Sequence, residues 1–127
     1  MNNQKVIFIH GYMNTGKVWQ NWIDYFHAKG YDCISPSWPG LVGSDKNYDD
    51  GLTKLKDITF NDVINYYSNI IGSMNEKPIL VGHSLGGVIV QKLMALKLGA
   101  AAVCINSGPP KGIAALNYNF IVSNMLL

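Results

Sequence analysis

Charged residues are scarce in this sequence of 127 residues, at 14%, and its net charge is only +2. The Lys and Arg residues are not clustered, so there is no basic patch of the kind that binds nucleic acid. No hydrophobic run approaches the roughly 18 residues of a membrane span, and the run Val6–Ile9 is too short for the core of a signal peptide. We therefore expect no nucleic-acid partner, no membrane insertion and a cytoplasmic location.

Cysteine is also rare. Cys33 and Cys104 each lie in a strand-like apolar run, which favours two buried free thiols over a disulfide. His, Cys, Asp and Glu residues show no metal-ligand spacing, and a site combining His27 with Asp45 and Asp49-Asp50 is disfavoured. We expect neither a metal nor a cofactor.

The composition is otherwise that of a folded chain, because 48% of the residues are hydrophobic. The sequence contains no internal repeat, no low-complexity segment and no linker, so we expect one domain over residues 1–127.

Short apolar runs alternate with helical patterns along the chain. Strands are expected at Lys5–His10, Tyr31–Ser35, Pro78–Val81 and Ala101–Ile105, and helices at Val18–Phe26, Phe60–Met74 and Leu85–Leu98, with stops at Gly30 and Gly99. Thr59 and Asp62 resemble a capping box. This alternation predicts an α/β fold, a mostly parallel sheet of about four strands with helices on both faces. Ligands of such sheets bind beyond the carboxyl ends of the strands.

The most informative motif is Gly82-His83-Ser84-Leu85-Gly86, which lies between a predicted strand and a predicted helix. A serine flanked by glycines at such a turn is typical of a nucleophile elbow, in which a strained backbone presents the hydroxyl at the edge of the sheet. An ordinary serine in a glycine-rich turn is the alternative. The strand before Ser84 and the helix after it favour the elbow.

Three motifs together carry a family resemblance. They are Phe8-Ile9-His10-Gly11, then Pro36-x-Trp38-Pro39-Gly40 with Gly43 and Ser44 beyond it, and Val81-Gly82-His83-Ser84-Leu85-Gly86-Gly87. The chain resembles the amino-terminal half of an α/β-hydrolase-fold protein of the serine esterase, lipase and cofactor-free haloperoxidase-like group. The resemblance implies a hydrolase that acts on a small-molecule carboxylic ester or related acyl compound. It also implies the strand order second, first, third, fourth.

The resemblance also implies roles for individual residues. Ser84 is the candidate nucleophile, and the backbone N–H groups of Tyr12 and Leu85 are the candidate oxyanion hole. Met13 is an alternative to Tyr12. His10 and Gly11 are expected to support the site, with the His10 ring hydrogen-bonded to loop backbone, and His83 and Trp38 to line or support it. Trp19, Trp22 and Trp38 could each line an acyl pocket. For Trp38 this role and a packing role are equally favoured, whereas for Trp19 and Trp22 a place in the core is favoured.

The residues that would activate Ser84 are missing. Residues 85–127 contain no Asp, Glu or His, whereas this fold orders its triad as Ser, acid, His. Either the sequence is truncated and the acid and histidine lie beyond Leu127, or the chain is an inactive relic or interaction module, or a second chain completes a split enzyme. Different chemistry on the same scaffold, such as a lyase or peroxidase, is a narrower alternative. The apolar strand Ala101–Ile105 would be an exposed sheet edge, so we expect self-association there.

Overall fold

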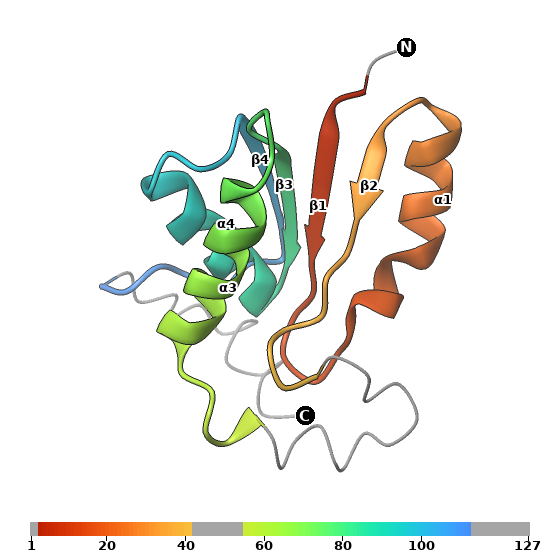
Figure 1. The fold of residues 1–127 in the computed structure, drawn as a ribbon. Coiled ribbons are helices and arrows are strands. Elements are labelled where there is room, and N and C mark those ends of the chain that lie inside the picture. The colour runs from red at the N-terminus through yellow and green to blue at the C-terminus, as the bar shows by residue number, and fades with distance from the viewer. Residues whose placement is uncertain (1–2, 42–54, 113–127) are drawn as a thin grey trace.

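One parallel sheet organises the part of the chain that the computed structural model describes, residues 3–41 and 55–112 (Figure 1). Its strands there are β1 (Lys5–Ile9), β2 (Asp32–Ile34), β3 (Ile79–His83) and β4 (Ala101–Ile105). They lie in the order β2-β1-β3-β4 and pair in parallel throughout. The predicted fold class and the predicted strand order are both confirmed.

Helices cover the two faces of this sheet unequally. A 3-10 turn, η1 (Gly16–Trp19), leads into α1 (Gln20–Ala28), which lies on one face, whereas α3 (Phe60–Gly72) and α4 (Leu85–Ala95) lie on the other (Figure 1). Successive side chains of a strand point to opposite faces. In β1, Val6 and Phe8 therefore belong to the core beneath α1, whereas Ile7 and Ile9 belong to the core beneath α3 and α4.

Helices α1 and α4 both end at a residue in the left-handed backbone conformation. After α1, Gly30 has a φ of 87° and Tyr31 donates its N–H to the Phe26 carbonyl at 3.1 Å, a Schellman motif. The same motif ends α4 three residues before the predicted Leu98. There Lys97 adopts a φ of 59°, and Leu98 donates its N–H to the Leu93 carbonyl at 3.1 Å. The predicted stop at Gly99 was therefore two residues late.

Two burial predictions were wrong. Trp22, expected in the core, is 45% exposed, and Cys104, expected to be a buried thiol, is exposed because the outer side of β4 has no neighbour among the described residues. Cys33 is buried as expected, and neither cysteine forms a disulfide. The predictions for Gly43, Ser44 and residues 113–127 concern parts of the chain outside the described residues.

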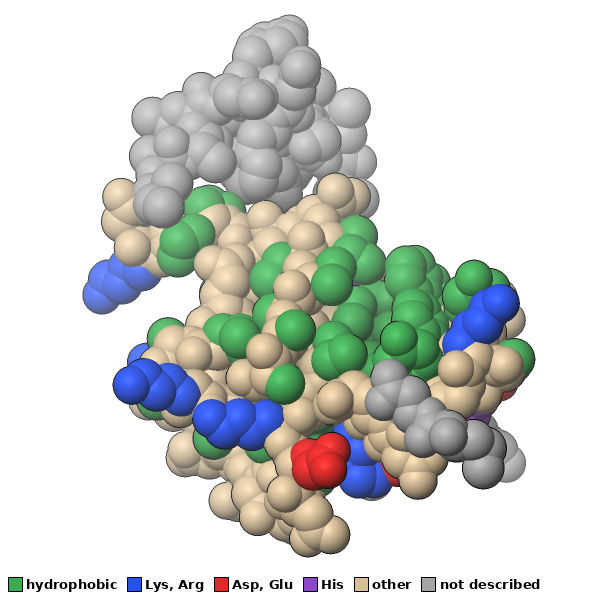
Figure 2. Space-filling view, turned by 90° about the horizontal axis from the view of Figure 1, so that it is seen from above, with side chains coloured by type: hydrophobic (Ala, Val, Ile, Leu, Met, Phe, Trp, Pro, Cys, Tyr) green, Lys and Arg blue, Asp and Glu red, His purple; other side chains and the backbone are tan. Residues whose placement is uncertain are grey.

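Hydrophobic side chains also reach the surface, as Figure 2 shows for one end of the molecule. Val103 of β4, at 50% exposed, and Trp22 are among the large ones. The four residues Ala101–Cys104 are all exposed. None of the described helices is both long enough and apolar enough to cross a bilayer.

Candidate active site

Ser84 lies in a strained turn between a strand and a helix. β3 ends at His83 and α4 begins at Leu85, and Ser84 between them has a φ of 54° and a ψ of −123°. Such a conformation in a non-glycine residue costs on the order of 1–3 kcal/mol and persists only where the surroundings enforce it. Here the Ser84 N–H donates to the Ile105 carbonyl at 3.0 Å, and the Gly87 N–H donates to the Ser84 carbonyl at 3.0 Å. Ser84 is the N-cap residue of α4, yet its hydroxyl makes no capping hydrogen bond.

The glycines around Ser84 are required by close backbone approach. A Cβ on Gly82 would stand 2.3 Å from the carbonyl oxygen of Gly86, and a Cβ on Gly86 would stand 2.2 Å from that of Ile9. A Cβ on Gly11 would stand 3.1 Å from the Cβ of Ser84 and 3.6 Å from its Oγ. The loop after β1 therefore lies directly against the serine.

His10 is buried at the end of β1, where loop backbone holds both of its ring nitrogens. Its Nε2 accepts the Trp38 backbone N–H at 3.1 Å, so its Nδ1 carries the proton and donates to the Gly11 carbonyl at 2.8 Å. Desolvation by burial lowers the pKa of His10, although the hydrogen bond to Gly11 opposes this shift. The ring is therefore neutral, and neither nitrogen has a lone pair or proton free for Ser84.

Tyr12 and Leu85 line a common cavity on the side of the sheet covered by α3 and α4. Its volume is about 160 Å³, and its walls are mostly apolar. They include Trp38, Phe60, Val63 and Ile89. No backbone carbonyl of residues 3–41 or 55–112 outside α4 accepts a hydrogen bond from the N–H of Tyr12 or Leu85.

Trp38 belongs to the wall of this cavity and is 4% exposed. Its ring stacks on His10 with centroids 5.0 Å apart and lies 6.5 Å from the ring of Tyr12. The two roles weighed for Trp38, lining the cavity and packing, are therefore combined in one side chain. Met13, the alternative to Tyr12, is 54% exposed with a φ of 63° and is not among the residues that line the cavity.

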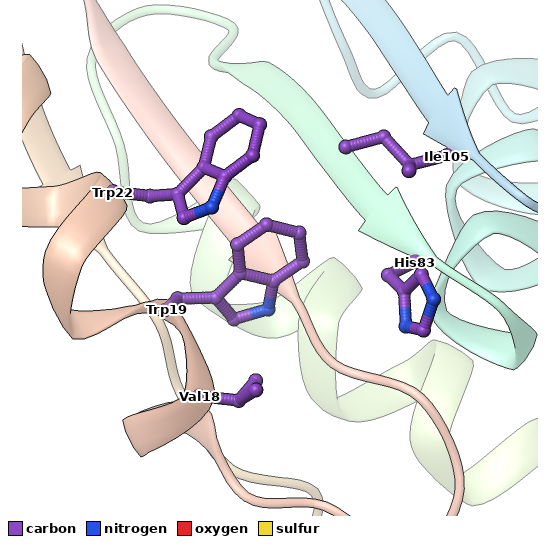
Figure 3. Close-up of a pocket in the computed structure, with 5 residues that line it drawn as sticks. All are labelled: Val18, Trp19, Trp22, His83 and Ile105. Carbon is purple, nitrogen blue, oxygen red and sulfur yellow. The ribbon is translucent and has the colours of Figure 1, made fainter.

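His83 borders a second cavity, on the α1 side of the sheet. Trp19, Trp22, Val18 and Ile105 complete its walls (Figure 3). The sequence favoured the core over an acyl pocket for both tryptophans and did not associate them with His83. No local pattern links these residues, because η1 and β3 are far apart along the chain.

No general base accompanies Ser84 in the described part of the chain. No histidine or carboxylate among residues 3–41 and 55–112 hydrogen-bonds to its hydroxyl. Several of the histidines and carboxylates in these ranges instead bind other groups. His27 accepts the Cys33 backbone N–H, Asp32 pairs with Lys5, and Asp62 completes the capping box of Thr59. Over the same residues, no group of three His, Cys, Asp or Glu side chains is arranged to hold a metal.

One polar contact at the sheet edge was missed by sequence reasoning. The Nε2 of Gln91 in α4 donates to the Oγ of Ser107 at 2.7 Å. Ser107 also lies against Gly87, because a Cβ added to Gly87 would stand 2.6 Å from the Cβ of Ser107. The contact anchors the loop after β4 beside the elbow. The glycine at position 87, which this close approach requires, is the one signal of the contact in the sequence.

A family model described as "Alpha/beta hydrolase family" matches residues 6–125. No curated protein matches the sequence. Among solved structures, an extracellular alpha/beta-hydrolase from a Paenibacillus species is 22% identical, with a TM-score of 0.66 over 84% of this chain and 42% of its own. A pyrethroid hydrolase from Sphingobium faniae JZ-2 is 22% identical, with a TM-score of 0.64 over 82% of this chain and 40% of its own. Tomato methylketone synthase I, complexed with 2-tridecanone, is 21% identical, with a TM-score of 0.71 over 100% of this chain and 49% of its own.

Identities this low establish a shared fold and nothing about the reaction. The chain spans between 40% and 49% of the length of these three proteins. The Paenibacillus protein is extracellular, so the fold does not fix the compartment, and the cytoplasmic location of this chain stays a prediction.

Proposed function

This chain belongs to the alpha/beta hydrolase family, and on that premise we propose that it is the nucleophile-bearing half of a serine hydrolase acting on carboxylic esters or related acyl bonds. The observation that carries the proposal is the backbone of Ser84, with its φ of 54° between β3 and α4. A fold maintains such strain where the displayed side chain has a task. The hydroxyl, which makes no capping hydrogen bond, is the group displayed.

The proposed chemistry uses Ser84 together with the cavity beside Leu85. The serine Oγ would form a bond to the acyl carbon, and the N–H groups of Tyr12 and Leu85 would stabilise the negative charge that develops on the carbonyl oxygen. Leu85 is also the first residue of α4, where the helix dipole favours negative charge. Collapse of the tetrahedral intermediate would break the bond to the alcohol, and water would then release the acid.

A base must take the proton of Ser84 and return it to the leaving alcohol. We place that base, a histidine, and its acid outside the described residues, either beyond Leu127 or in a second chain. The comparison lengths support this arrangement, since the chain spans less than half of the solved proteins reported above. In the alternative, the chain is an inactive relic or interaction module, which the exposed strand β4 favours.

The proposal is tested by chemical rescue with an external base. The purified chain is incubated with a fluorophosphonate, with and without imidazole, and the modified residue is identified by mass spectrometry. We expect labelling of Ser84 only when imidazole is present, because no histidine or carboxylate of the described residues hydrogen-bonds to its hydroxyl. Ser84→Ala serves as the blank, and Ser107→Ala, which removes a serine at the same sheet edge, is expected to label like the unaltered chain.

Each other outcome has a definite meaning. Rapid Ser84 labelling without imidazole contradicts the account of the missing base. No Ser84 labelling at any imidazole concentration contradicts the role of Ser84 as nucleophile and leaves the interaction module as the better reading.

A further inference from the structure

The cavity beside His83 lies on the opposite side of the elbow from the Leu85 cavity. It measures about 200 Å³, and it draws its walls from η1, α1, β3 and β4 through Val18, Trp19, Trp22, His83 and Ile105 (Figure 3). Because His83 immediately precedes Ser84, a molecule in this cavity would lie next to the elbow. The proposed reaction above assigns this cavity no role.

Trp19 brings an unsatisfied hydrogen-bond donor to the cavity. Its side chain is 4% exposed, and its Nε1 has no hydrogen-bond partner among residues 3–41 and 55–112. Figure 3 shows this nitrogen on the edge of the indole that faces across the cavity toward His83. Buried N–H groups are nearly always paired, since leaving one unpaired costs its full desolvation. The donor therefore calls for an acceptor supplied from outside the described residues.

Two of the five lining residues are tryptophans whose rings pack against each other and against Phe8. The rings of Trp19 and Trp22 meet edge to face, with centroids 5.5 Å apart and an interplanar angle of 86°. Phe8 supports both from the sheet, at 5.1 Å from Trp19 and 6.2 Å from Trp22. Aromatic walls of this kind favour flat aromatic groups, which gain edge-to-face contacts beyond simple burial.

The size of the cavity limits the ligand. Apolar cavities of about 150 Å³ hold a benzene molecule in other proteins, so a pocket of about 200 Å³ has room for one substituted aromatic ring. No carboxylate or lysine is among the lining residues, so the wall offers no carboxylate or ammonium group to pair with an ionic ligand.

We propose that this cavity is a binding subsite for a neutral aromatic ring that carries one hydrogen-bond acceptor, held by the indole N–H of Trp19. The subsite itself rests on the cavity and on the indole N–H of Trp19. Only the identification of the ring as a part of the substrate, placed beside Ser84 by His83, rests on the proposed function.

The test follows the indole N–H signals of the full chain by nuclear magnetic resonance. Trp19, Trp22 and Trp38 give three such signals, and single Trp→Phe variants assign them. The probes are acetophenone, which has a ring and a carbonyl, ethylbenzene, which has the ring alone, and octan-2-one, which has the carbonyl without the ring. We expect acetophenone to move the Trp19 signal downfield and to bind about five-fold more tightly than ethylbenzene, as one net hydrogen bond predicts.

Trp19→Phe keeps an aromatic ring and removes the donor. In this variant we expect acetophenone to bind no more tightly than ethylbenzene, whereas Trp22→Phe keeps the five-fold preference. Should Trp19→Phe fail to fold, Val18→Phe offers a second route. Val18 is 55% exposed, and the larger side chain would fill the cavity and weaken both ring-bearing probes at least ten-fold.

Several results overturn the assignment. A shift confined to the Trp38 signal would place the probe in the Leu85 cavity, and equal binding of octan-2-one would remove the preference for a ring. A Trp19 signal that moves with protein concentration alone would mean that a second copy fills the cavity. None of these readouts depends on Ser84, so failure of the subsite and failure of the imidazole-rescue experiment are distinguishable.

Discussion

The backbone N–H of Trp38 donates to the Nε2 of His10 at 3.1 Å, and the two rings stack with centroids 5.0 Å apart. Through this pair the loop after β2 is tied to the loop after β1. The second ring nitrogen of His10 holds Gly11, which in turn lies against Ser84. The position of the serine therefore depends on a neutral histidine that has no part in the proposed proton transfer.

The neutrality of His10 predicts acid lability. Burial lowers its pKa below the ordinary 6.5, so below pH 6.5 the unfolded chain binds a proton before the folded chain does. The contribution of His10 to the free energy of unfolding is therefore fully present above pH 6.5. As the pH falls below 6.5 this free energy decreases, by up to about 1.4 kcal/mol per pH unit for one proton. Urea unfolding at pH 7.5 and at pH 5.5 measures the loss.

Two variants isolate the histidine that is responsible. His10→Gln removes the titrating group, so we expect this part of the pH dependence to disappear, whereas His27→Gln should retain it. If His10→Gln does not fold, titration of the His10 ring by nuclear magnetic resonance in the unaltered chain remains decisive. A ring that titrates at or above pH 6.5 contradicts the argument.

Gly86 and Gly72 make a matched pair for the packing of the elbow. In Gly86→Ala the new Cβ would meet the Ile9 carbonyl oxygen at 2.2 Å, so the backbone must shift, and we expect a loss of about 3 kcal/mol or more. In Gly72→Ala the new Cβ meets nothing within 4 Å, and alanine in the last residue of α3 should add about 0.5–1 kcal/mol. Denaturant midpoints compare the two, and equal midpoints would contradict the close approach at Gly86.

The strain at Ser84 predicts an unusual order of stability among its variants. Glycine adopts a φ of 54° freely, whereas alanine does not. Relief of about 1–3 kcal/mol of strain exceeds the roughly 0.5–1 kcal/mol that glycine loses in chain entropy. We expect Ser84→Gly to be more stable than Ser84→Ala by about 1 kcal/mol in urea unfolding. The opposite order would mean that the turn is not strained.

The exposed strand β4 predicts association between copies. Val103→Lys places a charge on the open edge, which opposes strand pairing, and we expect it to lower the fraction of dimers and larger species in sedimentation velocity. Leu96→Lys is the matched control, because Leu96 is similarly exposed, at 47%, but lies at the end of α4. If both variants lower association equally, hydrophobicity in general is responsible and the edge of β4 is not.

What the sequence predicted well rests on local signals. The strand order followed from the family resemblance that the short motifs carry. The turn at Ser84 followed from Gly82 and Gly86, which are needed where the backbone approaches too closely for a side chain. The contacts of His10 with loop backbone agree with what that resemblance implied. In each of these cases a few neighbouring residues determine the backbone conformation, so the pattern survives in a single sequence.

What the sequence did not reveal depends on distant partners. Cys104 lies in an apolar run and Trp22 recurs with other apolar residues at helical spacing, yet their exposure is decided by which elements cover β4 and α1. The end of α4 depends on Lys97, a residue that adopts a left-handed conformation although it is not glycine. The cavity between Trp19 and His83 forms because η1 and β3, which are distant in the sequence, both pack against β1.

The parallel pairing of β1 with β3 has a consequence for how the chain is made. Val6 lies opposite Ile79, and Gln4 bonds to the Lys77 carbonyl across 73 residues of sequence. Contacts this distant slow folding, because the intervening loop must close before they form. During synthesis one edge of the apolar strand β1 therefore stays unpaired until β3 has left the ribosome. In that interval β1 can be protected only by its pairing with β2 and its packing against α1.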